Sequence, residues 1–75
     1  MQLEYYHGMM SQENATTILL RQHPGAYFLR QGRNHDTVIS YKSKVDNQIM
    51  HNKISGPAEL KDLIKQEIIS HSLKN

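Results

Sequence analysis

The sequence contains no cysteine and no tryptophan, and it has only two prolines and one phenylalanine among its 75 residues. The absence of cysteine excludes disulfides and thiolate metal ligands, and it fits a reducing compartment. No apolar run approaches the length that spans a membrane, and the first four residues, Met1 to Glu4, do not resemble a signal peptide. We therefore expect a cytoplasmic domain that makes no use of a membrane.

The residues that are present indicate one small folded domain. Hydrophobic residues make up 37% of the chain, which is too high a fraction for a disordered segment. A chain of this length can build one modest core, but neither a second domain nor a large enclosed active site. The formal net charge of +2 does not by itself identify a nucleic-acid-binding protein. We therefore expect residues 1–75 to form a single domain, on its own or as part of a longer protein.

Apolar residues at helical spacing predict two helices. Ser11 is a typical N-cap residue, and the pattern behind it predicts a helix over 12–21 that Pro24 and Gly25 bring to an end. Pro57 is favourable at the first position of a second helix. The residues expected to face the core are Ala15, Ile18 and Leu19 in the first helix, and Leu60, Leu63, Ile64 and Ile68 in the second.

Between the helices, three segments predict antiparallel strands, over 26–30, 37–42 and 48–54. The first of them is apolar on both faces, so we expect it to be covered on both sides. A short extended segment over 3–7 precedes the first helix, and Gly8 is expected to end it. The predicted fold is α+β, a three-stranded antiparallel sheet flanked by two helices, one on each face.

One residue, Arg30, does not fit a covered strand. Residues two apart share a face, so Arg30 points the same way as Ala26 and Phe28. A buried charge is costly unless it is paired. Either the aliphatic part of the Arg30 side chain therefore lets the guanidinium reach water, or the guanidinium holds an anion. The donor-rich loop over 31–35 favours the anion, since arginine binds phosphate in a bidentate fork and Gly32 lets the backbone approach a ligand closely.

The third strand can add two groups to such a site. His51 and Lys53 share one face of that strand, and this face can be the Arg30 face if the two strands lie in one sheet. On their own, a histidine in a strand is more often structural than a ligand contact, and a lone lysine is more often a solvated charge. Spacing alone leaves these alternatives open.

Two other functions fit the sequence less well. An enzyme would need a nucleophile beside a base or a metal-ligand spacing, and the histidines have no such spacing, at positions 7, 23, 35, 51 and 71. Ser40 and His51 can meet across adjacent strands, but such a coincidence is common. The alternative that we retain is a small basic nucleic-acid-binding domain, although its basic residues alternate with acids and its aromatics lie in apolar contexts. Its candidate basic surface is Arg33, Lys42, Lys44 and Lys53.

Taken in order, the motifs of the chain resemble those of Src homology 2 domains. The segment from Gly25 to Arg30 is similar to the family's Gly-x-Phe-Leu-Val-Arg strand, and the segment from Ile49 to Ile54 to its Val-x-His-x-Lys-Ile strand. Each motif is weak alone, but their order over nearly the whole chain makes the resemblance specific. The other similar segments are Tyr5 to Gly8, Ser11 to Ala15 with Ile18 to Leu20, Ile39 to Tyr41, and Leu60 to Ile64.

The resemblance implies a non-enzymatic, monomeric signalling module that binds tyrosine-phosphorylated proteins or peptides, with no cofactor, metal, nucleic acid or membrane as partner. It implies that Arg30 makes two bonds to the phosphate, that the loop from Gly32 to His35 wraps the remaining oxygens, and that His51 and Lys53 contact the tyrosine ring. The full set expected to bind phosphotyrosine is Arg30, Gly32, Arg33, Asn34, His35, His51, Lys53 and Gln12.

The chain departs from the family pattern at four places. Tyr5 replaces the opening tryptophan, Gln12 replaces a basic residue of the first helix, and Gly32 replaces a loop hydroxyl. The three-residue link over 55–57 replaces further strands and a loop that, with a loop after the second helix, normally form the pocket for residues following the phosphotyrosine. We therefore expect little selectivity for flanking sequence. Such reduction suggests an unusual version of the family, such as a bacterial effector acting in host cytoplasm.

Overall fold

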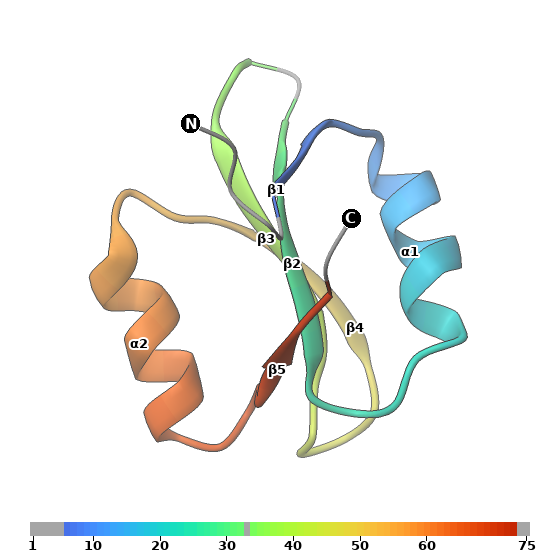
Figure 1. Ribbon diagram of the computed structural model, residues 1–75, viewed down its shortest axis with the longest axis vertical. Coiled ribbons are helices and arrows are strands. Elements are labelled where there is room, and N and C mark those ends of the chain that lie inside the picture. Colours follow the sequence, from blue (N-terminus) through green and yellow to red (C-terminus); the bar gives the residue numbers. More distant parts are fainter. Residues whose placement is uncertain (1–5, 33, 74–75) are drawn as a thin grey trace.

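A computed structural model describes residues 6–32 and 34–73 of the chain. A central sheet lies between two helices, which Figure 1 shows on opposite sides of it. Tyr5 and Arg33, for which the sequence makes predictions, lie outside the described residues. The elements are β1 (Tyr6–Met9), α1 (Gln12–Leu20), β2 (Ala26–Gln31), β3 (Thr37–Lys42), β4 (Ile49–Lys53), α2 (Pro57–Lys65) and β5 (His71–Ser72).

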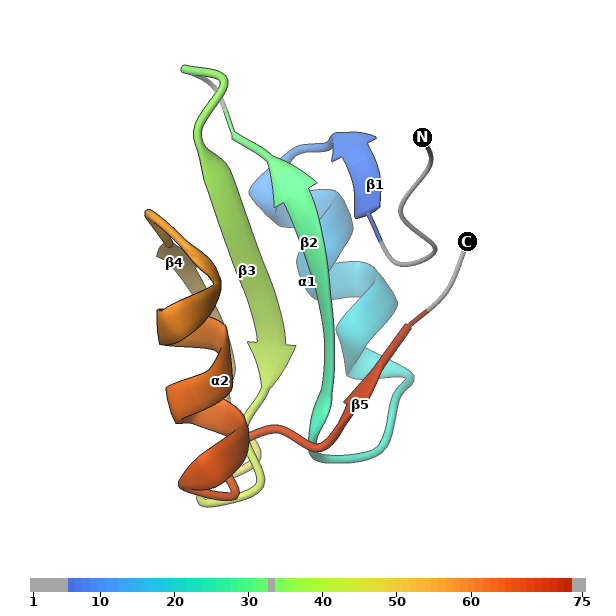
Figure 2. The same cartoon turned by 60° about the vertical axis from the view of Figure 1, so that its left-hand side comes forward.

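The strands β2, β3 and β4 form the predicted three-stranded antiparallel sheet. Two short strands extend it, because β1 and β5 both pair with β2 in parallel, at different places along it (Figure 2). The prediction that Gly8 ends the first extended segment is wrong. Gly8 has a positive φ of 73°, but the strand continues through it to Met9, with an irregular register against β2. The short β5 has no counterpart in the sequence prediction.

The helices begin where the sequence predicts. Ser11 caps α1 by accepting a hydrogen bond from the Asn14 N–H, with 3.1 Å between nitrogen and oxygen. The last residue of α1 is Leu20, one residue earlier than predicted. Pro57 occupies the first turn of α2, which ends at Lys65. At nine residues each, neither described helix is long enough to cross a membrane.

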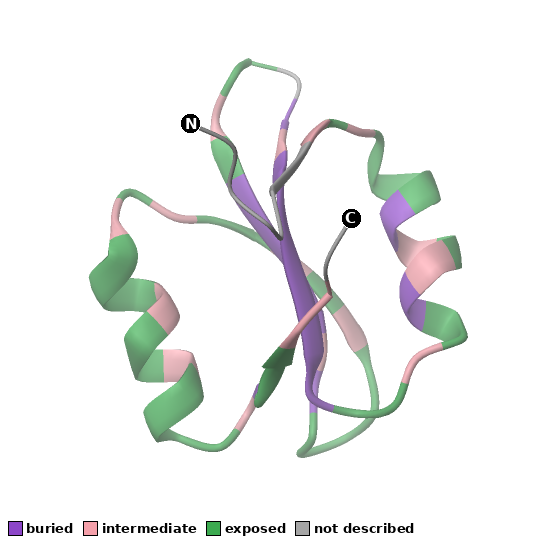
Figure 3. Cartoon of the chain, in the orientation of Figure 1, coloured by how far each residue is buried: buried purple, intermediate pink, exposed green. Residues whose placement is uncertain are grey.

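The sheet separates two apolar clusters, and the buried residues concentrate on its central strands (Figure 3). Side chains of β2 alternate between the clusters, as the period of a strand requires. Ala26 and Phe28 join Ala15 and Leu19 on the α1 face. The buried residues of the α2 face are Tyr27, Leu29, Ile39, Tyr41 and Ile69.

The predicted apolar stripe of the second helix is correct except at one residue. Leu60, Leu63 and Ile68 pack against the core, but Ile64 is exposed. Helix α2 ends at Lys65, one residue after Ile64. Glu67, with a positive φ of 60°, then turns the chain, so that the segment beyond the helix covers the core in place of Ile64. The sequence pattern could not show this turn, and it also missed the burial of Ile69.

Candidate anion-binding site

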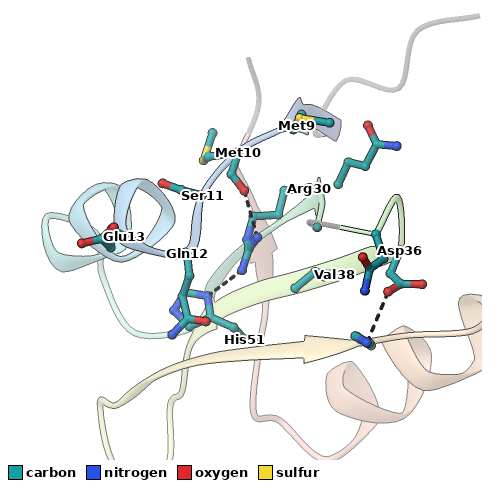
Figure 4. Close-up of a pocket in the computed structure, with 13 residues that line it drawn as sticks. Met9, Met10, Ser11, Gln12, Glu13, Arg30, Asp36, Val38 and His51 are labelled. Carbon is teal, nitrogen blue, oxygen red and sulfur yellow. Dashed lines mark hydrogen bonds and ion pairs between the residues drawn. The ribbon is translucent and has the colours of Figure 1, made fainter.

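A pocket of about 670 Å³ lies on the α1 face of the sheet, between the start of α1, the end of β2 and strand β4 (Figure 4). Six of the residues predicted to form a site line it: Arg30, Gly32, Asn34, His51, Lys53 and Gln12. His35 does not line it, and Arg33 lies outside the described residues. The lining residues that the sequence analysis did not assign to the site are Met9, Met10, Ser11, Glu13, Gln31, Asp36 and Val38.

Arg30 lies at the base of this pocket with only 5% of its surface exposed. Its Nε donates to Ser40 Oγ at 2.8 Å, and its Nη1 donates to the Met10 carbonyl oxygen at 3.0 Å. Its Nη2 lies 3.4 Å from His51 Nδ1. A guanidinium carries five N–H groups, so these contacts leave one on each terminal nitrogen. A bidentate fork to an oxyanion needs two N–H groups on neighbouring nitrogens, which is the number that remains.

His51 holds the guanidinium in place from β4, and its surroundings determine its protonation. Burial, and then the charge of Arg30, lower the pKa of His51, which favours the neutral ring. Its Nδ1 lies 2.9 Å from Ser40 Oγ and its Nε2 lies 2.9 Å from Thr16 Oγ1. Thr16 Oγ1 donates to the Gln12 carbonyl oxygen, also at 2.9 Å. The proton is therefore assigned to Nε2, so that the single lone pair of Nδ1 accepts from the Ser40 hydroxyl and Nε2–H donates to Thr16, while Arg30 Nη2 makes only the longer contact with Nδ1.

This chain of hydrogen bonds contains Ser40 and His51, which meet across the adjacent strands β3 and β4. They are opposite each other in the β3–β4 register, as the sequence analysis considered for an enzyme. Ser40 is fully buried and its oxygen already accepts from Arg30, so it is not placed as an accessible nucleophile. The pair instead orients the arginine. Burial lowers the pKa of Arg30, yet arginine remains a cation in proteins.

The second basic side chain of the pocket, Lys53, is arranged differently. Its side chain is 72% exposed, and its Nζ lies 3.3 Å from Asp36 Oδ2. Asp36 lies just before β3, which is antiparallel to β4, so the register brings it beside Lys53. Glu13 adds a second carboxylate to the wall, at the start of α1. Sequence reasoning missed both acids, although their positions at element ends were visible.

The loop after β2 closes partly on itself. The Gly32 N–H donates to the Asp36 carbonyl oxygen at 2.8 Å, and the His35 N–H donates to the Gly32 carbonyl oxygen at 3.1 Å. His35 has a positive φ of 64°, and its Nδ1 lies 2.7 Å from Gln31 Nε2. A Cβ at position 32 would lie 3.0 Å from Val38 Cγ2, so a side chain there, such as the hydroxyl residue of the family pattern, would require Val38 to shift by a few tenths of an ångström. The Gly32 amide and the His35 side chain are thus engaged within the loop.

Ser40 and Thr16 are the further residues that sequence reasoning did not assign to a site. The alternation of β3 gave a signal for Ser40, since it is a small polar residue at a position where both faces of the strand are buried. The signal for Thr16 was weaker, because it lies one helical turn after Gln12 on a face that the sequence alone does not orient.

Comparison with known proteins adds a family to this geometry. The model of the SH2 domain family matches residues 5–74. Among solved structures, the fold is similar to the solution NMR structure of the SH2 domain of a CRK/CRKL homologue from Monosiga brevicollis. The TM-score is 0.65 and the identity is 28%, over 75% of this chain and 54% of that chain. This chain thus spans about half the length of that structure. No curated protein matches it.

Proposed function

Because this chain belongs to the SH2 domain family of non-catalytic phosphotyrosine-binding modules, we propose that it captures tyrosine-phosphorylated proteins with little selectivity for flanking residues. The family match confirms the predicted fold and the prediction that this domain is not an enzyme. The identity of the phosphorylated partner, a monomeric state and a cytoplasmic location are parts of the proposal.

The observation that carries the proposal is the arrangement of Arg30. It is a buried cation whose two remaining N–H groups suit a bidentate bond to a phosphate, and Ser40, Met10 and His51 fix its orientation. A ligand side chain must be long to reach the base of the pocket. Phosphotyrosine has that length, whereas phosphoserine and phosphothreonine are shorter. We therefore assign the phosphate to Arg30 and the ring to the wall that His51 and Lys53 form.

Low selectivity is inferred from the short connections on either side of α2. Three residues, 54–56, join β4 to α2, and five residues, 66–70, join α2 to β5. Loops of this length leave flanking ligand residues in water, where they contribute little discrimination.

A peptide array tests both parts of the proposal. Peptides carry a fixed phosphotyrosine with each flanking position varied, beside matched sets in which that residue is tyrosine or phosphoserine. We expect binding to the phosphotyrosine set alone, with affinities that vary within a few-fold across flanking sequences. Equal binding to the unphosphorylated set would contradict phosphotyrosine recognition. A strong preference at one downstream position would contradict low selectivity and leave phosphotyrosine recognition standing.

A further inference from the structure

Two neighbouring threonines of α1 differ in what their hydroxyls contact. Thr16 Oγ1 donates to the Gln12 carbonyl oxygen, and Thr17 Oγ1 donates to the Glu13 carbonyl oxygen at 3.0 Å, so both make the same bond to the residue four positions back. Thr17 is exposed, whereas Thr16 is half-buried and its Oγ1 also lies 2.9 Å from His51 Nε2. Of the two, Thr16 therefore links the helix to the sheet.

The direction of the bond between Thr16 and His51 follows from the second partner of the hydroxyl. Thr16 Oγ1 lies 2.9 Å from the Gln12 carbonyl oxygen and 2.9 Å from His51 Nε2. A carbonyl oxygen only accepts, whereas each nitrogen of an imidazole can donate or accept. If the hydroxyl donates to Gln12, its oxygen keeps lone pairs that accept from His51 Nε2–H. This is the arrangement in which both contacts are hydrogen bonds.

The same direction continues from His51 to the arginine. With the proton on Nε2, His51 Nδ1 accepts from the Ser40 hydroxyl, whose oxygen accepts from Arg30 Nε. Each hydroxyl in this chain accepts once and donates once, and linked hydrogen bonds strengthen one another. The groups follow in the order Arg30 Nε, Ser40 Oγ, His51, Thr16 Oγ1 and the Gln12 carbonyl oxygen.

The other neutral tautomer of His51 would break this chain beside the arginine. A proton on Nδ1 would face the Ser40 oxygen at 2.9 Å and Arg30 Nη2, itself a donor, at 3.4 Å. The Ser40 hydroxyl would then lose the acceptor for its own proton. Ser40 is fully buried, and a buried hydroxyl without a partner is costly. The tautomer of His51 thus determines how well the guanidinium is held.

Helix α1 supplies hydrogen-bond acceptors to this arrangement and no cation, because Gln12 stands where the family pattern has a basic residue. The Met10 carbonyl oxygen, just before the N-cap, accepts from Arg30 Nη1, and the Gln12 carbonyl oxygen, just after it, ends the chain from Arg30 Nε. Figure 4 shows the guanidinium between Met10 and His51. The start of α1 therefore holds the arginine at two nitrogens, once directly and once through Thr16.

We propose that Thr16 is a positioning residue for phosphotyrosine binding: it accepts from His51 Nε2–H, and it thereby sets the tautomer of His51 and the orientation of Arg30. This inference rests on the proposed function and deepens it. Thr16 is not one of the described residues that line the pocket, so it acts through His51 and not through the ligand.

Calorimetry with a phosphotyrosine flanked by three alanines on each side tests the effect on binding. Thr16→Val removes the hydroxyl and keeps the branched shape, Thr16→Ser restores the hydroxyl, and Thr17→Val removes the matched hydroxyl that faces water. We expect Thr16→Val to weaken binding about two- to tenfold, the range for one hydrogen bond, and the other two variants to stay within about twofold of wild type. Full affinity in Thr16→Val, or an equal loss in Thr17→Val, would overturn the proposal.

NMR of the free domain tests the mechanism without a ligand. Protonated and unprotonated imidazole nitrogens have well-separated chemical shifts, so spectra recorded at about pH 7.5, above the ordinary pKa of histidine, report the tautomer. We expect the proton on Nε2 of His51 in wild type, Thr16→Ser and Thr17→Val. In Thr16→Val we expect a population with the proton on Nδ1, and faster exchange of the Arg30 Nε–H with water. An Nδ1–H tautomer in wild type, or unchanged His51 and Arg30 signals in Thr16→Val, would contradict the positioning role.

The two measurements distinguish this inference from the proposed function. If wild type binds no phosphotyrosine peptide, the proposed function fails, and the positioning of a phosphate by Thr16 fails with it. If wild type binds and Thr16→Val binds equally well, phosphotyrosine recognition stands and the role of Thr16 is refuted. Circular dichroism checks the fold of each variant, and Thr16→Ala, which has a higher helix propensity, replaces Thr16→Val if the latter does not fold.

Discussion

Replacing Arg30 by methionine separates the function of this residue from its contribution to folding. Methionine keeps much of the length of the side chain but removes the charge and all five donors. The variant therefore deletes the two N–H groups assigned to the phosphate, together with the bonds to Ser40 and Met10 and the contact with His51. The bond between Ser40 and His51 does not depend on the arginine.

The expected loss of binding follows from the fork. A hydrogen bond between charged groups contributes roughly 1.5–3 kcal/mol, and a bidentate fork makes two of them. Their loss is worth about 3–6 kcal/mol, and each 1.4 kcal/mol is tenfold in affinity. Arg30→Met should therefore weaken phosphopeptide binding at least about a hundredfold.

The expected change in stability is much smaller. Burial of the guanidinium costs several kcal/mol, and its two hydrogen bonds and the contact with His51 return a similar amount. None of its described partners carries an opposite charge, so methionine strands no buried ion. We expect the free energy of unfolding to change by less than about 2 kcal/mol, which is below the 3–5 kcal/mol typical of breaking a buried ion pair.

Calorimetry with one phosphopeptide, and urea unfolding followed by circular dichroism, measure the two quantities. Arg21→Met is the matched control, because Arg21 is exposed just after α1, outside the pocket lining. The control should keep both affinity and stability. Affinity retained within a few-fold in Arg30→Met would refute the phosphate assignment. Loss of the fold would refute the argument that burial and hydrogen bonding nearly cancel.

The remaining predictions concern the pocket wall. Lys53→Ala should weaken phosphopeptide binding clearly more than Gln12→Ala in calorimetry, because Gln12 supplies no charge; a silent Lys53→Ala would mark a solvated surface charge. Asp36→Asn should tighten binding a few-fold at low salt and less at high salt, since it removes a carboxylate from the pocket; weaker binding would show instead that Asp36 positions Lys53. The pKa of His51 is lowered in the folded state by burial and by Arg30, so the unfolded chain takes up the proton first as pH falls through about 6.5. Urea unfolding should therefore show wild type losing more stability between pH 7.5 and 5.5 than His51→Gln, and parallel losses would argue against a neutral His51.

The parts of the fold that local chemistry determines could be predicted from the sequence. Ser11 as a cap and Pro57 at the start of a helix are local signals, and both helices begin where those signals place them. The alternation of β2 predicted that Arg30 shares a face with Phe28, and the structure places both on the α1 face. A charge at the end of a doubly covered strand was the signal that located the site.

The features that the sequence could not predict depend on register and on chain direction after turns. The hydrogen bonds from His51 to Ser40 and Thr16 require the β3–β4 register and the rotation of α1, and neither is visible in a residue pattern. The contact between the His35 and Gln31 side chains depends on the positive φ of His35, which the residue types in the loop do not predict. The turn at Glu67 likewise brings Ile69 into the core and leaves Ile64 exposed, whereas Ile68 packs against the core as predicted.

The two basic side chains of the pocket differ in how their charges are balanced, and this difference bears on function. Lys53 already faces Asp36 in the free domain, so a bound phosphate must compete with that carboxylate. The described partners of Arg30 are a hydroxyl, a carbonyl oxygen and an imidazole whose pKa is lowered by burial and by Arg30 itself, and they orient the guanidinium without supplying a negative charge. Because its geometry is fixed and its charge is unbalanced, Arg30 gains most from a dianion such as phosphotyrosine. The strength of binding should thus be determined mainly by Arg30, with Lys53 adjusting it in a way that depends on ionic strength.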